Sequence, residues 1–283
     1  MTIPRLSSRI VSFRYPDGTI ALEDIQLDIQ QVEFCGILGS NGSGKTTLLK
    51  VLDGIVKDFS GSVLLDGVDI RRQTPREIYS KVGLVFQNPD DQLFAHSVYE
   101  DVAFGPRNMG CSEMEVSRRV GEALESVEMD KLAAKDIHNL SYGQKKRVCI
   151  AGLLAMGHEI LLLDEPTAGL DPMGEYRMME LLTRLNRDSG VTIVMATHSV
   201  DLVPVFLSRL HILSRGKLVR SGTPEEVFNG DEELASVKLR LPYIAELIHR
   251  LKTGDNVPFK RLPLTVGEAR REILEAFGRC NET

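Results

Sequence analysis

A stretch of nine residues has the types and spacing needed to bind a polyphosphate. It fits the pattern G-x-x-x-x-G-K-[ST], whose glycines let the backbone turn tightly and aim N–H groups at an anion. Residues 34–38 before it have the composition of a short buried strand, and residues 47–52 after it that of a helix start. This context argues against a glycine-rich turn that binds nothing. The loop consists of Gly39, Ser40, Asn41, Gly42, Ser43, Gly44, Lys45, Thr46 and Thr47.

The loop predicts that the protein binds a nucleotide through its phosphates, together with Mg²⁺. We expect Lys45 to reach the β- and γ-phosphates and the Thr46 hydroxyl to bind Mg²⁺. The start of the following helix adds the positive end of its dipole to the same site. A phosphate-binding loop does not by itself say what is done with the nucleotide.

Two carboxylates and one histidine could supply hydrolytic chemistry. Asp164 and Glu165 follow the apolar run 160–163, which is typical of a buried parallel strand with acids at its carboxyl end. Asp164 is suited to Mg²⁺, and Glu165, which points differently because side chains alternate along a strand, is suited to be the general base for water. His198 lies at the carboxyl end of the predicted strand 191–196, after Thr197, and could hydrogen-bond the γ-phosphate. Taken alone, solvated acids at a strand end and a structural histidine are the alternatives.

The composition is that of an ordinary globular protein. Of the 283 residues 42% are apolar and 26% charged, and the formal net charge is -6, which argues against a basic nucleic-acid surface. The apolar runs fall short of the roughly 18 residues that span a bilayer. Residues 1–9 lack the apolar region of a secretory signal, and the four cysteines lack C-x-x-C spacing. We therefore expect a cytosolic protein with reduced thiols.

The order of the predicted elements indicates an α/β fold with a P-loop core. Residues 9–15 are expected to form an edge strand, in an antiparallel hairpin with a second strand that ends at residue 29. Strands and helices then alternate up to residue 221, interrupted by a helical subdomain at about 88–157. Residues 222–283 are expected to form a mostly helical appendage with one amphipathic stretch, 266–277. This appendage could extend a dimer contact or pack within one subunit.

Six ordered motifs resemble those of the ATP-binding subunits of ABC transporters. The similarity covers residues 5 to about 221. It implies a head-to-tail dimer in which the P-loop of one subunit and the signature stretch of the other enclose each of two ATP molecules. The motifs are the P-loop, Gln87, the signature stretch Leu140–Gln144, Ile160–Glu165, Ala168–Asp171 and His198.

The resemblance also implies roles for single residues. Tyr15 would stack on adenine, although taken alone it is typical of a strand aromatic that covers the core. Gln87 would contact Mg²⁺ and water and couple the site to a membrane partner, and Asp171 would cross the dimer. The signature residues would bind the opposing ATP at the N-terminus of a helix over 144–157. These signature residues are Ser141, Tyr142, Gly143 and Gln144.

Two positions depart from the family pattern. Tyr142 stands where the signature usually has a glycine, and it would be strained if its φ had to be positive. Val32 stands in place of a glycine in the turn before the P-loop strand. The basic run 145–147 after the signature is expected to lie on a solvated helix face rather than to bind phosphate or lipid.

A narrower resemblance is carried by residues 86–94 and 100–106. They look like the corresponding segments of the ATPases of energy-coupling-factor importers, notably the cobalt or nickel type called CbiO. This implies an integral membrane coupling protein, a separate substrate-binding membrane protein, and an ATPase on the cytoplasmic face of the cell membrane. The substrate would be a cobalt or nickel ion, or alternatively a vitamin. The second ATPase subunit would be another copy of this chain or a related one.

Two other classes of ATPase are weaker interpretations. A soluble ABC-type ATPase that acts on DNA or ribosomes would carry a long coiled coil between its motifs or a second ATPase domain. An ordinary P-loop kinase or GTPase would leave residues 140–144 unexplained. The motifs therefore favour a transporter motor.

Overall fold

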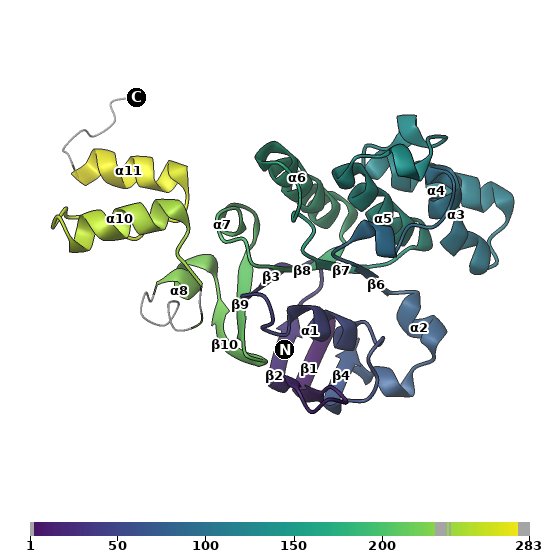
Figure 1. The fold of residues 1–283 in the computed structure, drawn as a ribbon, viewed down its shortest axis with the longest axis horizontal. Helices are drawn as coiled ribbons and strands as arrows, with labels where there is room; N and C mark the ends of the chain where they lie inside the picture. The colour runs from purple at the N-terminus through teal and green to yellow at the C-terminus, as the bar shows by residue number, and fades with distance from the viewer. Residues whose placement is uncertain (1–2, 230–236, 238, 277–283) are drawn as a thin grey trace.

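The computed structural model describes residues 3–229, 237 and 239–276, and it contains two β-sheets with helices around them (Figure 1). The order of the six-stranded sheet is β10-β9-β3-β8-β7-β6, and that of the four-stranded sheet is β2-β1-β4-β5. The strands are β1 (Leu6–Arg14), β2 (Ile20–Ile29), β3 (Phe34–Leu38), β4 (Ser60–Leu65), β5 (Val68–Asp69), β6 (Val82–Val85), β7 (Ile160–Asp164), β8 (Thr192–Thr197), β9 (Arg209–Ser214) and β10 (Lys217–Gly222). This arrangement confirms the predicted α/β class.

The helices follow the chain order of an α/β protein with an inserted helical region. They are α1 (Lys45–Leu52), α2 (Pro75–Tyr79), α3 (Val98–Asn108), α4 (Glu113–Ser126), α5 (Tyr142–Met156), α6 (Pro172–Ser189), α7 (Val203–Phe206), α8 (Pro224–Phe228), α10 (Tyr243–Thr253) and α11 (Val266–Ala276). Among the residues that the structure describes, none of these helices is both long and apolar enough to span a bilayer.

The six-stranded sheet is buried on both faces. Its strands β9, β3, β8, β7 and β6 run parallel, and β10 is antiparallel to β9. Successive residues of β7 enter different cores: Leu161 and Leu163 pack in the core shared with α5 and α6, whereas Leu162 packs in the core shared with α1 and the antiparallel sheet. This double burial explains why the strand is a continuous apolar run.

The register of the parallel strands brings the predicted site residues to one edge. Leu38, which ends β3, lies beside Thr197, and Asp164, which ends β7, lies beside Ala196. Since carboxyl ends of parallel strands meet at the same edge, the P-loop, the two acids and His198 converge there.

The antiparallel sheet differs from the expected hairpin. β1 pairs with β2 on one side and with β4 on the other, so the prediction that residues 9–15 form an edge strand was wrong. The third strand follows the P-loop helix, and a hairpin signal within residues 9–29 carries no information about it. The sheet bends at bulges, where Ile10 and Asp24 both have φ of 51°.

The helical region is a compact unit beside β6 and β7 (Figure 1). The predicted apolar face of α4 is buried, including Val116, Val120 and Leu124, and it packs with α3 and α5. Ser112 caps α4 by accepting a hydrogen bond from the Glu115 N–H. The region therefore presents α5, which carries the signature at its start, to the sheet.

The C-terminal residues divide between two cores. Val227 and Phe228 of α8 belong to the core under the sheet. α10 and α11 form a helical pair, seen at the end of the molecule far from α5 in Figure 1, around their own small cluster of Ile248, Phe259 and Ala269. The expected amphipathic helix is present as α11, although Phe277, its predicted last residue, lies outside the described residues.

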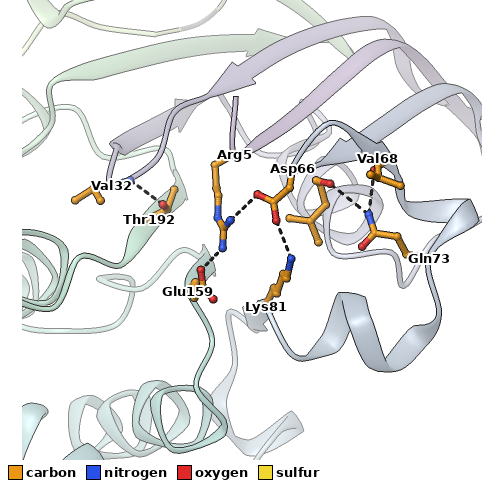
Figure 2. Close-up of polar contacts among 9 residues, drawn as sticks. Arg5, Val32, Asp66, Val68, Gln73, Lys81, Glu159 and Thr192 are labelled. Atoms are coloured by element: carbon orange, nitrogen blue, oxygen red, sulfur yellow. Dashed lines mark hydrogen bonds and ion pairs between the residues drawn. The ribbon is translucent and has the colours of Figure 1, made fainter. Parts of the chain in front are cut away.

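At the amino ends of the parallel strands, a polar network joins the two sheets, as Figure 2 shows. Asp66 Oδ1 accepts a hydrogen bond from Arg5 Nη1 at 2.5 Å, and its Oδ2 lies 2.8 Å from Lys81 Nζ. Arg5 also pairs with Glu159, the residue before β7. These partly exposed pairs fix where the antiparallel sheet sits against the parallel one.

The turn before β3 forms in spite of its valine. Val32 has φ of 57°, a left-handed conformation that costs a β-branched residue roughly 1 kcal/mol or more. The Thr192 hydroxyl accepts a hydrogen bond from the Val32 N–H at 2.9 Å, and Asn186 Nδ2 donates to the Val32 carbonyl at 2.9 Å. The departure from glycine is thus accommodated by neighbours on β8 and α6.

Candidate nucleotide-binding site

The P-loop forms a tight turn whose glycines are required by space and by conformation. Gly42 and Gly44 have φ of 78° and 107°, in the region that favours glycine. A Cβ on Gly39 would lie 2.4 Å from Ser43 Oγ and 2.5 Å from the Leu213 carbonyl oxygen. The loop is consequently compact enough to bring consecutive backbone N–H groups around an anion at the start of α1.

Lys45 is held at the centre of this loop. Its side chain is almost fully buried, and Nζ donates to the carbonyl oxygens of Gly39 at 2.8 Å and Ser40 at 3.3 Å. Nζ also lies 3.4 Å from Glu165 Oε1. The structure thus places one buried cation between the phosphate loop and the predicted base.

The end of β7 meets the P-loop through a short hydrogen bond. The Thr46 hydroxyl donates to Asp164 Oδ2 at 2.6 Å, while Asp164 Oδ1 and Ser43 Oγ are buried without a hydrogen-bond partner. Burial raises the pKa of Asp164, and the Thr46 hydrogen bond and the charge of Lys45 act in the opposite direction. An unpartnered carboxylate oxygen beside a hydroxyl is the donor set that Mg²⁺ prefers, so these residues fit the ion.

The Glu165 carboxylate is bound by two basic side chains. His198 Nδ1 lies 2.8 Å from Glu165 Oε1, at hydrogen-bond distance from this carboxylate oxygen. Glu165 is 4% exposed, whereas the side chain of His198 is 53% exposed. The histidine therefore orients the acid from the solvent side, and its second nitrogen is free to meet a ligand.

The backbone of Glu165 is strained. Its φ of 49° lies in the left-handed region, and Pro166 follows it. The Glu165 N–H donates to the Ala196 carbonyl at 2.9 Å, and its own carbonyl accepts from the Ala168 N–H at 3.1 Å and from Lys146 Nζ at 2.6 Å. Three hydrogen bonds thus hold the turn that aims the carboxylate.

Lys146 corrects an expectation from the sequence. The basic run 145–147 was expected on a solvated face, but Lys146 is 1% exposed and donates to the carbonyls of Glu165 and Ala168. Burial lowers the pKa of Lys146 to about 8. Helical phase could have revealed this burial, because Lys146 shares its face with Cys149, Ile150 and Leu153, which are buried.

A cavity of about 440 Å³ opens over the P-loop. Tyr15 stands at its wall with 41% exposure, and its hydroxyl makes a 2.8 Å hydrogen bond with Thr47 Oγ1. Residues that the sequence did not single out also line it, namely Thr19, Ile20 and Ala21 of the turn and start of β2. Other lining residues are those predicted for nucleotide and metal: Asn41, Gly42, Gly44, Lys45, Thr46, Thr47, Gln87, Asp164 and Glu165.

The signature residues line a separate cavity of about 430 Å³, which includes Ser141, Gly143 and Gln144. Ser141 caps α5 reciprocally: its Oγ accepts from the Gln144 N–H at 3.3 Å, and Gln144 Oε1 accepts from the Ser141 N–H at 3.0 Å. Tyr142 has ordinary helical φ, so it is unstrained. The signature is a preformed helix N-terminus on a face of its own.

Tyr142 and Asp171 use their side chains within this chain. The Tyr142 hydroxyl donates to the Gln87 carbonyl at 3.1 Å, which ties the signature to the loop after β6. Asp171 caps α6 by accepting from the Gly174 N–H at 2.6 Å, and it is exposed. Gln87 itself is exposed at the mouth of the P-loop cavity.

The geometry of a P-loop, strand-end acids and a separate signature helix matches a known family. The model of the family described as ABC transporter matches residues 22–168. An ABC transporter ATP-binding protein of Geobacter sulfurreducens is 72% identical over 271 residues, which are 96% of this chain and 97% of that protein. The chain belongs to the ABC transporter ATPases. Its activity is ATP hydrolysis coupled to transmembrane transport.

Further similarities support the EcfA type of this ABC ATPase. The energy-coupling factor transporter ATP-binding protein EcfA of Methanococcus maripaludis is 47% identical over 272 residues, covering 95% of this chain and 97% of EcfA. The solved structure of CbiO1 from Clostridium perfringens, described as part of the ABC transporter complex CbiONQ, has a TM-score of 0.77 and 42% identity. It covers 87% of this chain and 99% of CbiO1. This ABC ATPase is therefore the ATP-binding motor subunit of an energy-coupling-factor transporter.

Proposed function

We propose that this motor works as a head-to-tail dimer that drives import of cobalt or nickel ions. The observation that carries the dimer is the division of the nucleotide site into two cavities on one chain. The P-loop, Asp164 and Glu165 line one cavity, and the signature residues line the other. A two-fold axis between two copies would set each signature over the opposite P-loop, because a C2 interface pairs such patches reciprocally.

In the proposed site, each predicted residue has one task. Lys45 binds the β- and γ-phosphates, the P-loop N–H groups cradle the phosphates, and Tyr15 stacks on adenine. Thr46, Asp164 and Gln87 hold Mg²⁺, which when bound neutralises charge on the phosphate oxygens. From the opposite subunit, Ser141 and Gly143 at the N-terminus of α5 approach the γ-phosphate, and Asp171 crosses the interface.

Glu165 is the proposed general base. Its carboxylate would orient the attacking water and accept its proton, and the hydrogen bond from His198 Nδ1 holds the carboxylate in place for this step. The imidazolium form of His198, with a proton on each ring nitrogen, would donate from Nδ1 to Glu165 and from Nε2 to a γ-phosphate oxygen. Because both groups are oriented before ATP arrives, little reorganisation is needed during hydrolysis.

An exposed aromatic pair supports the proposed contact with a membrane coupling protein. Phe94 and Phe104 are 66% and 47% exposed and meet edge to face, with ring centroids 4.7 Å apart. Asp101 Oδ2 accepts hydrogen bonds from the N–H groups of Phe94 and Ala95, each at 3.0 Å, so the pair is fixed to α3. Both rings follow Gln87 in the chain, and apolar side chains presented in this way suit a docking helix.

The cobalt or nickel assignment rests on the likeness to CbiO1, and import of a vitamin by the same machinery is the alternative. A separate substrate-binding membrane protein would select the cargo, and this ATPase would sit peripherally on the cytoplasmic face of the membrane. We further propose a homodimer, and a domain boundary at about residue 222, after β10, with the remainder as an appendage.

Affinity capture from gently solubilised membranes of the source organism tests the proposal. Tagged wild type and a Phe94→Ser, Phe104→Ser variant are compared by mass spectrometry of the integral proteins retained. We expect a small multi-helix coupling protein and a substrate-binding membrane protein with wild type only. Uptake of labelled Co²⁺ or Ni²⁺ by cells that express the set then identifies the cargo. Capture of ribosomal or DNA-associated proteins instead would contradict the transport function.

A further inference from the structure

Lys146 occupies an unusual position for a lysine. It lies in the second turn of α5 and is among the largest fully buried side chains of the described residues. Two of its three N–H bonds go to carbonyl oxygens, of Glu165 at 2.6 Å and of Ala168 at 2.9 Å. Burying a lysine costs free energy unless its N–H groups are hydrogen-bonded. These two contacts therefore allow Lys146 to lie in the core.

Both carbonyls belong to the turn that carries the proposed base. The turn begins at Glu165, whose left-handed backbone is strained, and it closes through the Ala168 N–H, which donates to the Glu165 carbonyl. Lys146 bridges the two ends of this turn from outside. The direction of the Glu165 carboxylate depends on the φ and ψ of the same residue, so a clamp on its carbonyl also acts on its side chain.

Tyr142 extends this connection along the same face of α5. It lies four residues before Lys146, and its ring centroid is 5.1 Å from Lys146 Nζ, within the range of a cation–π contact. The Tyr142 hydroxyl donates to the Gln87 carbonyl. A Cβ on Gly169 would lie 3.0 Å from the Tyr142 ring, so the chain after the turn packs closely on the same side chain.

We infer that Lys146 is a positioning residue for Glu165, and that with Tyr142 it makes the base turn and the Gln87 loop follow the orientation of the signature helix. This inference rests on the proposed role of Glu165 as base. Lys146 touches backbone oxygens and leaves the carboxylate of Glu165 to His198 and Lys45, so it acts through the position of the base. A shift of α5 is thereby passed to both loops within one subunit.

The test is a double-mutant cycle on the full-length protein, with steady-state ATP hydrolysis as the readout. Lys146→Met keeps the length of the side chain and removes its donors. We expect kcat to fall roughly 10- to 100-fold, because a misplacement of about 1 Å can cost 10²-fold. The Kd for a fluorescent ATP analogue should stay within about threefold, since the P-loop is untouched. In the Glu165→Gln background, Lys146→Met should change the remaining rate less than about twofold.

Several outcomes would overturn the inference. Equal losses from Lys146→Met in both backgrounds would mean that it does not act through the base. Lys145→Met is the matched control, because it removes the same charge one residue earlier, where Nζ pairs with Asp90. An equal loss of kcat in this control would mean that the effect comes from removing any positive charge near the signature. Unchanged kcat for Lys146→Met beside an inactive Glu165→Gln would refute this inference alone, whereas normal turnover of Glu165→Gln would refute the base itself.

A milder variant covers the case in which Lys146→Met does not fold. Tyr142→Phe removes one oxygen and keeps the helix and the ring contact with Lys146. We expect kcat to fall by roughly two- to tenfold, in keeping with the loss of one hydrogen bond of about 1 kcal/mol, with the Kd for the ATP analogue unchanged. A kcat equal to that of wild type would remove Tyr142, and with it the link to Gln87, from the inference.

Discussion

The two halves of the proposed nucleotide site are built in opposite ways. In the P-loop half, Lys45, Asp164 and Glu165 are nearly fully buried at the carboxyl edge of the sheet. In the signature half, Ser141 is exposed and Gly143 is half-buried at the start of a helix. One half is set by the core of the protein, and the other by a single helix N-terminus on the surface.

This difference indicates a division of labour. A buried, hydrogen-bonded half can bind nucleotide by itself, because its groups are already desolvated and oriented when the protein has folded. The attraction between an exposed helix N-terminus and a phosphate becomes strong only when a partner surface excludes water from it. We therefore expect changes in the P-loop half to alter binding and chemistry in the single subunit, and changes in the signature half to act through association.

Removing the base gives the largest expected effect. Glu165→Gln should lower kcat by about 10²- to 10⁴-fold, because an amide cannot accept the proton of water. Binding of ATP should survive, and the variant should accumulate as a closed dimer that size-exclusion chromatography with light scattering detects. Glu180→Gln, an exposed carboxylate on α6, is the control. Normal turnover of Glu165→Gln would contradict the assignment.

Acidification should lower the free energy of unfolding through His211 on β9, the strand that pairs with β3 before the P-loop. Burial lowers the pKa of His211 on β9 from 6.5 to about 4, with Arg209 adding to the effect. The unfolded chain therefore binds the proton first, and stability falls as the pH drops through this window, by on the order of 3 kcal/mol in full. Urea unfolding at pH 7 and pH 5 measures it. His211→Asn keeps a polar partner for Ser221 and should show a smaller loss; an equal loss would contradict the prediction.

Removing the P-loop cation should weaken binding itself. Lys45→Ala should raise the Kd for ATP roughly 10- to 100-fold, since a hydrogen bond to a charged group contributes about 1.5–3 kcal/mol. Titration of the monomer with a fluorescent ATP analogue gives the value. Affinity like that of wild type would count against the P-loop as the phosphate site.

The signature half should show the smallest effect and a different kind. Ser141→Ala removes the cap of α5, which costs about 1 kcal/mol of stability. The Kd of the monomer for the ATP analogue should stay unchanged, while ATP-dependent dimer formation weakens. A loss of monomer affinity as large as that of Lys45→Ala would erase the contrast between the two halves.

Local sequence patterns predicted most of the P-loop half. The glycines of the loop motif predict its tight backbone turn. The run 160–165 predicts both a buried strand and the acids at its end. The convergence with His198 follows from the parallel order of β3, β8 and β7, which alternation of strands and helices implies.

The features that the sequence did not predict depend on partners far away in the chain. β1 is an interior strand because residues 60–65 return to it after α1. Lys146 is buried because the turn at Glu165 offers it two carbonyls, 19 and 22 residues later. Val32 keeps its turn because Thr192 supplies an acceptor 160 residues away. Contacts between residues so far apart in the chain cannot be predicted from the pattern of ten neighbouring residues.

The central place of β3 has a consequence for synthesis on the ribosome. Residues 34–38 pair with residues 193–197 and 209–212, so the strand that leads into the P-loop has no neighbouring strand in its sheet until these later residues are made. At 5–20 residues per second this takes roughly ten to thirty seconds. The nascent chain must keep this apolar strand from pairing with a wrong strand during that time.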